Sequence, residues 1–550
     1  MAGKDDEDKT QALAIRLLRD GRSPDDAVRD GVVLTDWEAN PGWKISFGPM
    51  GGGPPKWAEF LQLTQAERSA LRQNSTFGLV FVPRDQRWFA VSFGLGHVKL
   101  DPDACEQDFG LKVVLNAVDP KKLRSADLRT PDVNTVSRRS QTSRRSEQGA
   151  FEIDAERDIV RGLMGEPKET EFGSKVSGGD ALTLRRKARL AQLPDICAQA
   201  LTLYGKDDYK EVFGWVDQIR HVRDQSTLTT LWAALAAALS EALSTGEVDD
   251  LHLAYPVIYD PDKAGWVRFK GYRDRVIFPD LELVHYIDGL KGAGIVAYDP
   301  DMLTSHSVQE CDENGASMGG TWKIAECAVF ETEIEGRRYV LSGGRWYEIA
   351  DDLVKEVTDF FAAVEKTTLP DAQAGDNEET YNDRQSKNAP DMVCLDRKLL
   401  KPTGAASAIE VCDFFEKTKR FIHIKDKTSS SRLSHLFSQG AVSAVVFKRD
   451  QALRKALVDL VSAQPNGALF APLLPQTSED VVAGDFTVVF GVLVNGAGGK
   501  EPKLPFFSLV SFRQAARQIR DELGFKLQFA WVKKPSAGAG KKATTKKPAA

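Results

Sequence analysis

The chain has 550 residues, of which 42% are hydrophobic and 28% are charged, and its formal net charge is -6. These values indicate a soluble globular protein of two to four domains and exclude a wholly basic nucleic-acid coat. No apolar run reaches the roughly 18 residues of a membrane span, and the charged N-terminus lacks the apolar region of a secretory signal. The six cysteines include no C-x-x-C pair, which favours reduced thiols. We therefore expect a cytoplasmic protein without a membrane partner.

The first 150 residues alternate between strand and helix patterns. A strand is expected from Leu13, and residues 77–82 and 88–93 predict a β-hairpin closed by the turn at 83–87. The segment 101–119 begins with acids suited to a helix N-terminus and has a helical middle. An α+β domain at residues 10–150 is the expected result.

A segment rich in serine, threonine and arginine, residues 123–149, follows this helix. Its low apolar content predicts an extended or mobile arm. Paired arginines suit bidentate contacts to phosphate, so Arg138, Arg139, Arg144 and Arg145 are candidate nucleic-acid contacts. The alternative is a solvated loop, since no aromatic residues interleave for base stacking.

Residues 151–366 predict a second α+β domain. Helices are expected at 156–165 and 193–205 with a strand at 181–186 between them, and Ser226 is expected to cap a long helix. Strand patterns separated by turns then lead to a helix at 351–365. A linker is expected from Leu369.

The segment 377–532 predicts a C-terminal α/β domain. Strands are expected at 392–400, 441–447, 486–494, 504–512 and 525–532, with helices from Ser431 and at 513–522. Residues 533–550 contain six lysines and no acid, which predicts a disordered basic tail.

The segment 409–440, IEVCDFFEKTKRFIHIKDKTSSSRLSHLFSQG, carries the main functional pattern. It predicts two strands around the turn EKTKR, then a helix with serine N-cap residues. Because strand side chains alternate, Asp413 is expected on one face of the first strand, and His423 and Lys425 on one face of the second. Ionisable residues thus occupy positions where apolar ones are usual.

An Asp on one strand and an x-x-Lys pair on the next, followed by a helix, resemble the core of the PD-(D/E)XK nuclease superfamily. That resemblance implies that Asp413 holds Mg²⁺ or Mn²⁺ and that Lys425 activates the attacking water. The family's helix acid corresponds to Glu378 or Glu379, of which Glu379 is the one expected at the site, and its helix glutamine corresponds to Gln439. His423 stands where the family has its second acid, and an imidazole ligand suits Mn²⁺ better than Mg²⁺.

A purely structural interpretation accounts for the same residues. Lys425 can protect a strand edge from aggregation, Asp413 can end a strand at a turn, and His423 can be a buried histidine beneath a helix. Two functions therefore stay open: a metal-dependent nuclease acting on DNA or RNA, and a catalytically silent nucleic-acid-binding or sensor protein. The histidine in place of an acid favours the second.

Taken end to end, the chain also resembles a sporadically distributed bacterial family of unknown function. The resemblance rests on FAVSFGLGHVKLDPDACEQDFGLKVVLNAVDP, on LRSADLRT, on DDYKEVFGWVDQI and on the segment 409–440. Its patchy distribution implies a mobile element or an anti-phage defence system, and the family brings no reaction with it.

Overall fold

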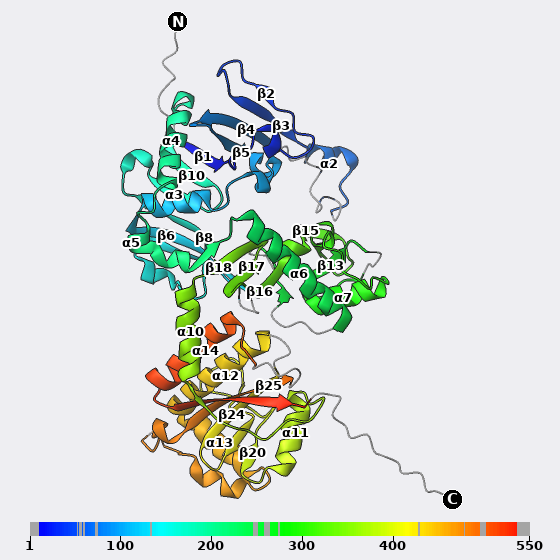
Figure 1. Cartoon of the computed structure of the whole chain (residues 1–550), viewed down its shortest axis with the longest axis vertical. Coiled ribbons are helices and arrows are strands. Elements are labelled where there is room, and N and C mark those ends of the chain that lie inside the picture. Colours follow the sequence, from blue (N-terminus) through cyan, green and yellow to red (C-terminus); the bar gives the residue numbers. More distant parts are fainter. Residues whose placement is uncertain are drawn as a thin grey trace, which may run out of the picture. The chain divides into compact units, whose positions relative to one another are not determined.

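The computed structural model describes residues 10–51, 53, 58, 61–71, 75–131, 135–245, 251–257, 265–272, 276–426, 430–477, 479–495 and 502–535. The chain divides into two compact units, one of residues 1–130 and 137–217 and the other of residues 131–136 and 218–550. Both units combine helices and sheets, as the sequence predicts (Figure 1). The segment predicted to be a disordered basic tail, 533–550, lies outside the described residues apart from 533–535.

The first unit is built on a ten-stranded sheet with the strand order β2-β3-β4-β5-β1-β10-β9-β8-β6-β7. Its strands are β1 (Thr10–Leu17), β2 (Thr35–Asp36), β3 (Lys44–Met50), β4 (Ser75–Arg84), β5 (Arg87–Gly94), β6 (Val118–Thr130), β7 (Val136–Ser146), β8 (Ile159–Pro167), β9 (Lys175–Gly178) and β10 (Leu182–Lys187). The predicted strand at Leu13 and the predicted hairpin are β1 and β4 with β5. Because the sheet continues to β10, it spans the domain boundary predicted at residue 150.

Two glycines set how closely helix α3 approaches the first sheet. The unit's helices are α2 (Gln65–Ala70), α3 (Phe109–Ala117), α4 (Leu193–Tyr204) and α5 (Lys210–Phe213). A Cβ atom on Gly110 would lie 2.1 Å from the Ala181 carbonyl oxygen, and one on Gly178 would lie 1.9 Å from the Gly110 carbonyl oxygen. Only glycine fits at such distances. The helix predicted within 101–119 is therefore held directly against β9 and β10.

The helix predicted at 156–165 is wrong, because this segment enters strand β8. The strand buries Val160 and Leu163. Gly162 and Gly165 both disfavour a helix, by about 1 kcal/mol each relative to alanine. A Cβ on Gly165 would lie 2.2 Å from a methyl group of Val118, so this glycine also lets β6 pair closely.

The segment predicted to be an extended or mobile arm includes the end of β6 and the whole of β7, which lies at the edge of the sheet. Acids that match its arginines lie on β6, on β8 and just before β8, distant from β7 in the sequence. The ion pairs are Arg138 with Asp158 at 2.5 Å, Arg139 with Asp127 at 2.5 Å and Arg145 with Glu166 at 2.9 Å. Among the described residues Arg144 has no ion-pair partner. Contact between this strand and nucleic acid stays a prediction.

The second unit begins with two antiparallel sheets, ordered β11-β18-β17-β16-β12 and β13-β14-β15. Their strands are β11 (Ile219–His221), β12 (Leu251–Leu253), β13 (Trp266–Lys270), β14 (Ser307–Cys311), β15 (Ser317–Lys323), β16 (Ala328–Ile334), β17 (Arg337–Ser342) and β18 (Arg345–Ile349). The helices in this stretch are α6 (Gln225–Thr245), α7 (Leu283–Gly292), α8 (Met302–Ser305), α9 (Ile324–Cys327) and α10 (Asp351–Ala363).

Helix α6 differs from its prediction at its N-terminus. The Asp224 carboxylate accepts hydrogen bonds from the Thr227 amide and the Ser226 hydroxyl, so Asp224 rather than Ser226 caps the helix. Among the described residues, this is the one helix long and apolar enough to cross a membrane by length and composition alone. Its side chains Leu231, Leu235 and Leu239 are buried in the protein core.

The C-terminal part of the second unit contains a six-stranded mixed sheet, ordered β19-β26-β25-β24-β23-β20. Its strands are β19 (Glu365–Lys366), β20 (Met392–Cys394), β23 (Phe414–Glu416), β24 (Arg420–Asp426), β25 (Thr487–Asn495) and β26 (Lys526–Lys534). Its helices are α11 (Glu378–Asn388), α12 (Ser430–Arg449), α13 (Gln451–Ser462) and α14 (Phe506–Ala516), which continues into a π-helical turn (Arg517–Glu522). A two-stranded sheet joins β21 (Leu399–Leu400) to β22 (Ile409–Glu410).

Direction and packing differ across this mixed sheet. Strands β24, β25, β26 and β19 are parallel, whereas β20, β23 and β24 pair antiparallel. On β24, Ile422 and Ile424 pack in one cluster with Tyr381 of α11, and Phe421 packs edge-to-face against Phe447 of α12. Helices α11 and α12 therefore cover opposite faces (Figure 1).

Two strands predicted in this part are helical. Residues 441–447 belong to α12, and residues 506–512 belong to α14. Helix α14 buries side chains around almost its whole circumference, so its sequence shows no amphipathic period to separate it from a buried strand. The serines predicted to cap α12 begin at Ser429, which lies outside the described residues.

A buried ion pair holds the ends of β24 and β26. Lys534 Nζ lies 2.7 Å from Asp426 Oδ2, and the two side chains are 9% and 6% exposed. We expect Lys534→Met to lower the free energy of unfolding by about 3 to 5 kcal/mol, because it leaves a buried carboxylate without its partner. Urea unfolding measures the effect, and Lys533→Met, at the exposed neighbouring position, is the matched control. Equal midpoints for the two variants would contradict this role.

Candidate functional site

The site begins at the N-terminus of α11. Asn377 caps this helix: its side-chain oxygen accepts a hydrogen bond of 2.9 Å from the Thr380 amide, and its own amide donates to the Thr380 hydroxyl. Tyr381 and Asn382 anchor the helix because both are buried against the sheet. Capping and anchoring together place Glu378, the first residue of the helix, beside the strand ends.

Three carboxylates meet at this point. Glu378, Asp396 and Asp413 each offer an oxygen, and these oxygens all lie within 4.8 Å of one another. They come from α11, from the loop after β20 and from the residue before β23. Asp396 and Asp413 are buried, and Glu378 is half-buried. Segments distant in the sequence therefore converge through the pairing of β20, β23 and β24.

Hydrogen bonds fix the orientation of Asp413. Its Oδ2 accepts a bond of 2.7 Å from the Ile424 amide, and its Oδ1 accepts one of 3.1 Å from Asn382 Nδ2. The Leu395 amide donates to its backbone carbonyl oxygen at 2.7 Å. Asp413 therefore connects β24, α11 and the segment that leads to Asp396.

The electrostatics of this group favour a cation. Burial, reinforced by the negative charge of Glu410, raises the pKa of Asp413 well above its usual range. Burial also raises the pKa of Glu410. Oxygens bound to one divalent ion lie at most about twice the bond length apart, or ~4 to 5 Å, which matches the spacing of the three acids. An all-oxygen donor set suits hard ions such as Mg²⁺ and Mn²⁺.

Lys425 and Gln439 border the acids. Lys425 Nζ lies 2.8 Å from Glu378 Oε1. Gln439 Nε2 donates to Glu410 Oε2 at 3.3 Å, and the Arg397 amide donates to Glu410 Oε1 at 2.5 Å. The structure thus brings Asp413, Lys425 and the predicted glutamine to one end of the sheet.

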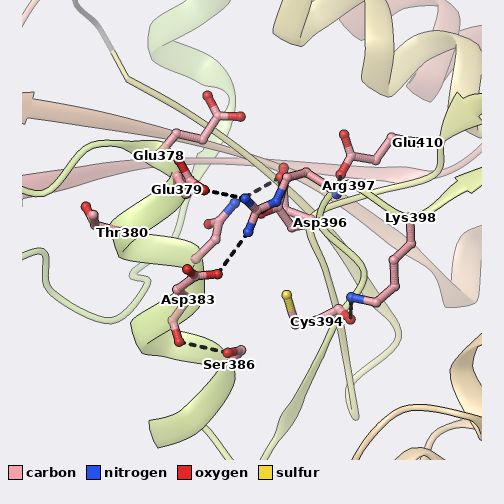
Figure 2. Close-up of polar contacts among 12 residues, drawn as sticks. Glu378, Glu379, Thr380, Asp383, Ser386, Cys394, Asp396, Arg397, Lys398 and Glu410 are labelled. Carbon is pink, nitrogen blue, oxygen red and sulfur yellow. Dashed lines mark hydrogen bonds and ion pairs between the residues drawn. The ribbon is translucent and has the colours of Figure 1, made fainter.

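Glu379, the acid chosen from the sequence, does not join the three carboxylates. Its side chain pairs with Arg397, whose guanidinium also contacts Asp383 at 3.0 Å and Asp396 at 3.3 Å. Figure 2 shows these acids directed at Arg397. Adjacent helix residues point about 100° apart, so only Glu378 can face Lys425. Glu378, the other helix acid named from the sequence, is the one that lies at the site.

His423 is not part of the group of three acids. It sits beneath α12, 3.5 Å from where a Cβ on Gly440 would lie, and its ring centroid is 5.9 Å from that of Phe490. Neither ring nitrogen has a hydrogen-bond partner among the described residues. Burial and then the charge of Lys425 lower the pKa of His423 to about 3, so the ring is neutral. The structure therefore does not bring His423 to the acids as the expected second metal ligand. Although it shares a strand face with Lys425, its ring is enclosed beneath α12, whereas the longer Lys425 side chain reaches Glu378.

Asp396 is the acid that sequence reasoning missed. It follows the buried residues Val393 and Leu395 directly, within a segment predicted to be one continuous strand. The strand β20 ends at Cys394. An acid directly after a buried strand is a sequence pattern that could have identified Asp396, because the ends of neighbouring strands can lie at the same edge of a sheet.

A family model matches residues 13–533, which include both units and every acid of the site. The chain belongs to the DUF6119 family. This is a family of unknown function. The prediction that most of the chain belongs to an uncharacterised family is therefore confirmed. No match was found among curated proteins or among solved structures.

The neutral His423 of this DUF6119 chain makes stability depend on pH. In the unfolded chain a histidine takes up a proton near pH 6.5, whereas the folded protein resists protonation down to about pH 3. Below pH 6.5 the unfolded state therefore binds more protons, and the free energy of unfolding falls by about 1.4 kcal/mol per pH unit.

We expect His423→Leu to remove this part of the pH dependence. The difference in urea-unfolding free energy between pH 7.5 and pH 5 should shrink by about 2 kcal/mol. His435→Leu, which replaces an exposed histidine on α12, should keep the wild-type difference. Identical pH profiles for wild type and His423→Leu would show that His423 is charged when folded.

Proposed function

We propose that this protein is a metal-dependent phosphodiesterase that cleaves nucleic acid. The observation that carries the proposal is the convergence of Glu378, Asp396 and Asp413, with the Lys425 ammonium 2.8 Å from Glu378. Three carboxylates and a lysine at one sheet edge are the groups needed to hold a divalent ion beside a phosphodiester.

The order of elements supports the proposal. Helix α11, the antiparallel strands β20, β23 and β24, helix α12 and the parallel strand β25 follow one another in the chain. This is the arrangement that the resemblance to the PD-(D/E)XK superfamily implies, with the helix acid, here Glu378, ahead of Asp413 in the chain. Asp396 supplies a carboxylate that the motif around His423 lacks.

The roles of the side chains follow from their positions. Glu378, Asp396 and Asp413 would hold the cation, which lowers the pKa of a bound water and neutralises phosphate charge. Asn382 and the Ile424 amide keep Asp413 oriented. Lys425 positions the attacking water and stabilises negative charge that develops on the phosphate. Gln439 holds Glu410 at the border of the site.

A catalytically silent binding protein is the competing function. It was favoured by a histidine at the position of the second acid. Asp396 provides an acid from another strand end, so the histidine at that position no longer favours the silent protein. Metal binding without cleavage of any nucleic acid would restore the silent protein as the better conclusion.

Metal binding distinguishes Asp396 from His423. Asp396→Asn removes one of three charged ligands, and we expect Mn²⁺ affinity to fall at least about tenfold, in the range typical for losing groups of a metal site. His423→Leu should bind Mn²⁺ as the wild type does, because the ring faces α12. Isothermal titration with Mn²⁺ measures both. Loss of affinity in His423→Leu alone would overturn the ligand assignment.

Cleavage is tested with charge-matched pairs of variants on supercoiled plasmid, single-stranded DNA and RNA, with Mg²⁺ or Mn²⁺. We expect Lys425→Met and Asp413→Asn to lose about 10²- to 10³-fold in rate. Their controls are Lys417→Met and Asp391→Asn, which break the exposed ion pair between those two residues. Equal rates for all four variants would remove this site from consideration.

A further inference from the structure

A cavity of about 400 Å³ adjoins the acidic site. It lies between the second half of α11, the segment from Ala389 through β20 to Lys398, and the turn after α13 at residues 464–466. Asp396 and Arg397 belong to both the cavity and the acidic site. Figure 2 shows Asp383, Ser386, Cys394 and Lys398 around this space, below Arg397.

The cavity's size limits its occupant. Proteins hold small molecules in pockets of roughly 300 to 1,000 Å³, so about 400 Å³ suits one nucleotide rather than a base pair. The described residues place no aromatic ring in its wall. Apolar surface comes instead from Pro390, Met392 and Pro465, which can pack against the flat face of a base.

The charged groups of the wall suit a phosphate. Lys398 Nζ donates one bond of 3.2 Å to the Cys394 carbonyl oxygen, which leaves two N–H groups for a ligand. Lys387 makes no ion pair within the described part of the chain. The two lining acids, Asp383 and Asp396, are already engaged by Arg397. The cations therefore exceed the acids by one, before any metal binds.

We propose that this cavity holds one unpaired nucleotide of the substrate, next to the phosphodiester at the acidic site. The inference rests on the proposed nuclease function and adds the substrate class, a single-stranded or unpaired nucleic acid. A base in a duplex is stacked and paired, and it can enter such a cavity only after extrusion, which costs a few kcal/mol. Gln464 and Asn466 place amide groups in the wall that can hydrogen-bond the exposed edge of a base.

Filling the cavity tests the inference. Ser386 lines the cavity from the exposed side of α11, and Asn388 is exposed on the same helix but does not line it. We expect Ser386→Trp to bind AMP and UMP at least about tenfold more weakly than the wild type, whereas Asn388→Trp binds them equally well. Calorimetric titration without metal measures this. Equal affinity of the two variants, or no binding by the wild type, overturns the cavity assignment.

A second variant, Lys398→Met, tests the cavity without adding a bulky side chain. Lys398→Met should weaken binding of the monophosphate about tenfold and leave binding of the corresponding nucleoside unchanged, because it removes only the charge that faces the phosphate. A loss shared equally by nucleotide and nucleoside would contradict the assignment of Lys398.

Cleavage assays separate this inference from the nuclease proposal. With Mn²⁺, the wild type should cut a single-stranded oligonucleotide at least about tenfold faster than a blunt duplex of the same sequence, and Ser386→Trp should lose that preference. Cleavage that is equal in Ser386→Trp and Asn388→Trp overturns the cavity inference and keeps the nuclease. Nucleotide binding that Ser386→Trp weakens, in a protein that cleaves nothing, overturns the nuclease and keeps the nucleotide site.

Discussion

The buried carboxylate of Asp413 is the constraint on which the C-terminal site depends. A charge with so little access to water is costly unless it is hydrogen-bonded, and Asp413 meets that cost with the Ile424 amide and Asn382. The same two bonds fix β24 and α11 relative to each other. The hairpin and the acidic site are therefore structurally coupled, because moving either partner away would leave one oxygen of the buried carboxylate without its donor.

Repulsion among the acids is balanced by cations around the group. Lys425 pairs with Glu378 on one side, and Arg397 joins Glu379, Asp383 and Asp396 on the other. The pairs of Arg397 with Glu379 and Asp383 are exposed and contribute little to stability, whereas Asp396 and Asp413 are shielded from water. The three carboxylates repel one another at the point where a bound divalent ion would neutralise their charge.

The sequence predicted what depends on local pattern and missed what depends on distant partners. The β23–β24 hairpin follows from its turn and alternation, and Lys425 and Gln439 lie near Asp413 as that pattern suggests. Asp396 could not be found from the hairpin, because it joins the site only through the pairing of β20 with β23. The β7 arginines suggested an extended or mobile arm because their acidic partners, on β6, on β8 and just before β8, are distant in the sequence. Helix α14 was mistaken for a strand because burial on nearly all sides removes the period that identifies a helix.

The turn at Arg397 joins the acidic site to the cavity within three residues. Arg397 has a φ of 59°, a left-handed conformation that is uncommon outside glycine, and it directs Asp396 toward the acids while Lys398 lines the cavity. Inserting or deleting one residue here would move Asp396 away from the acids or Lys398 out of the cavity wall. Homologous chains that retain this arrangement should therefore conserve the length of the segment from Cys394 to Lys398 more strictly than its composition.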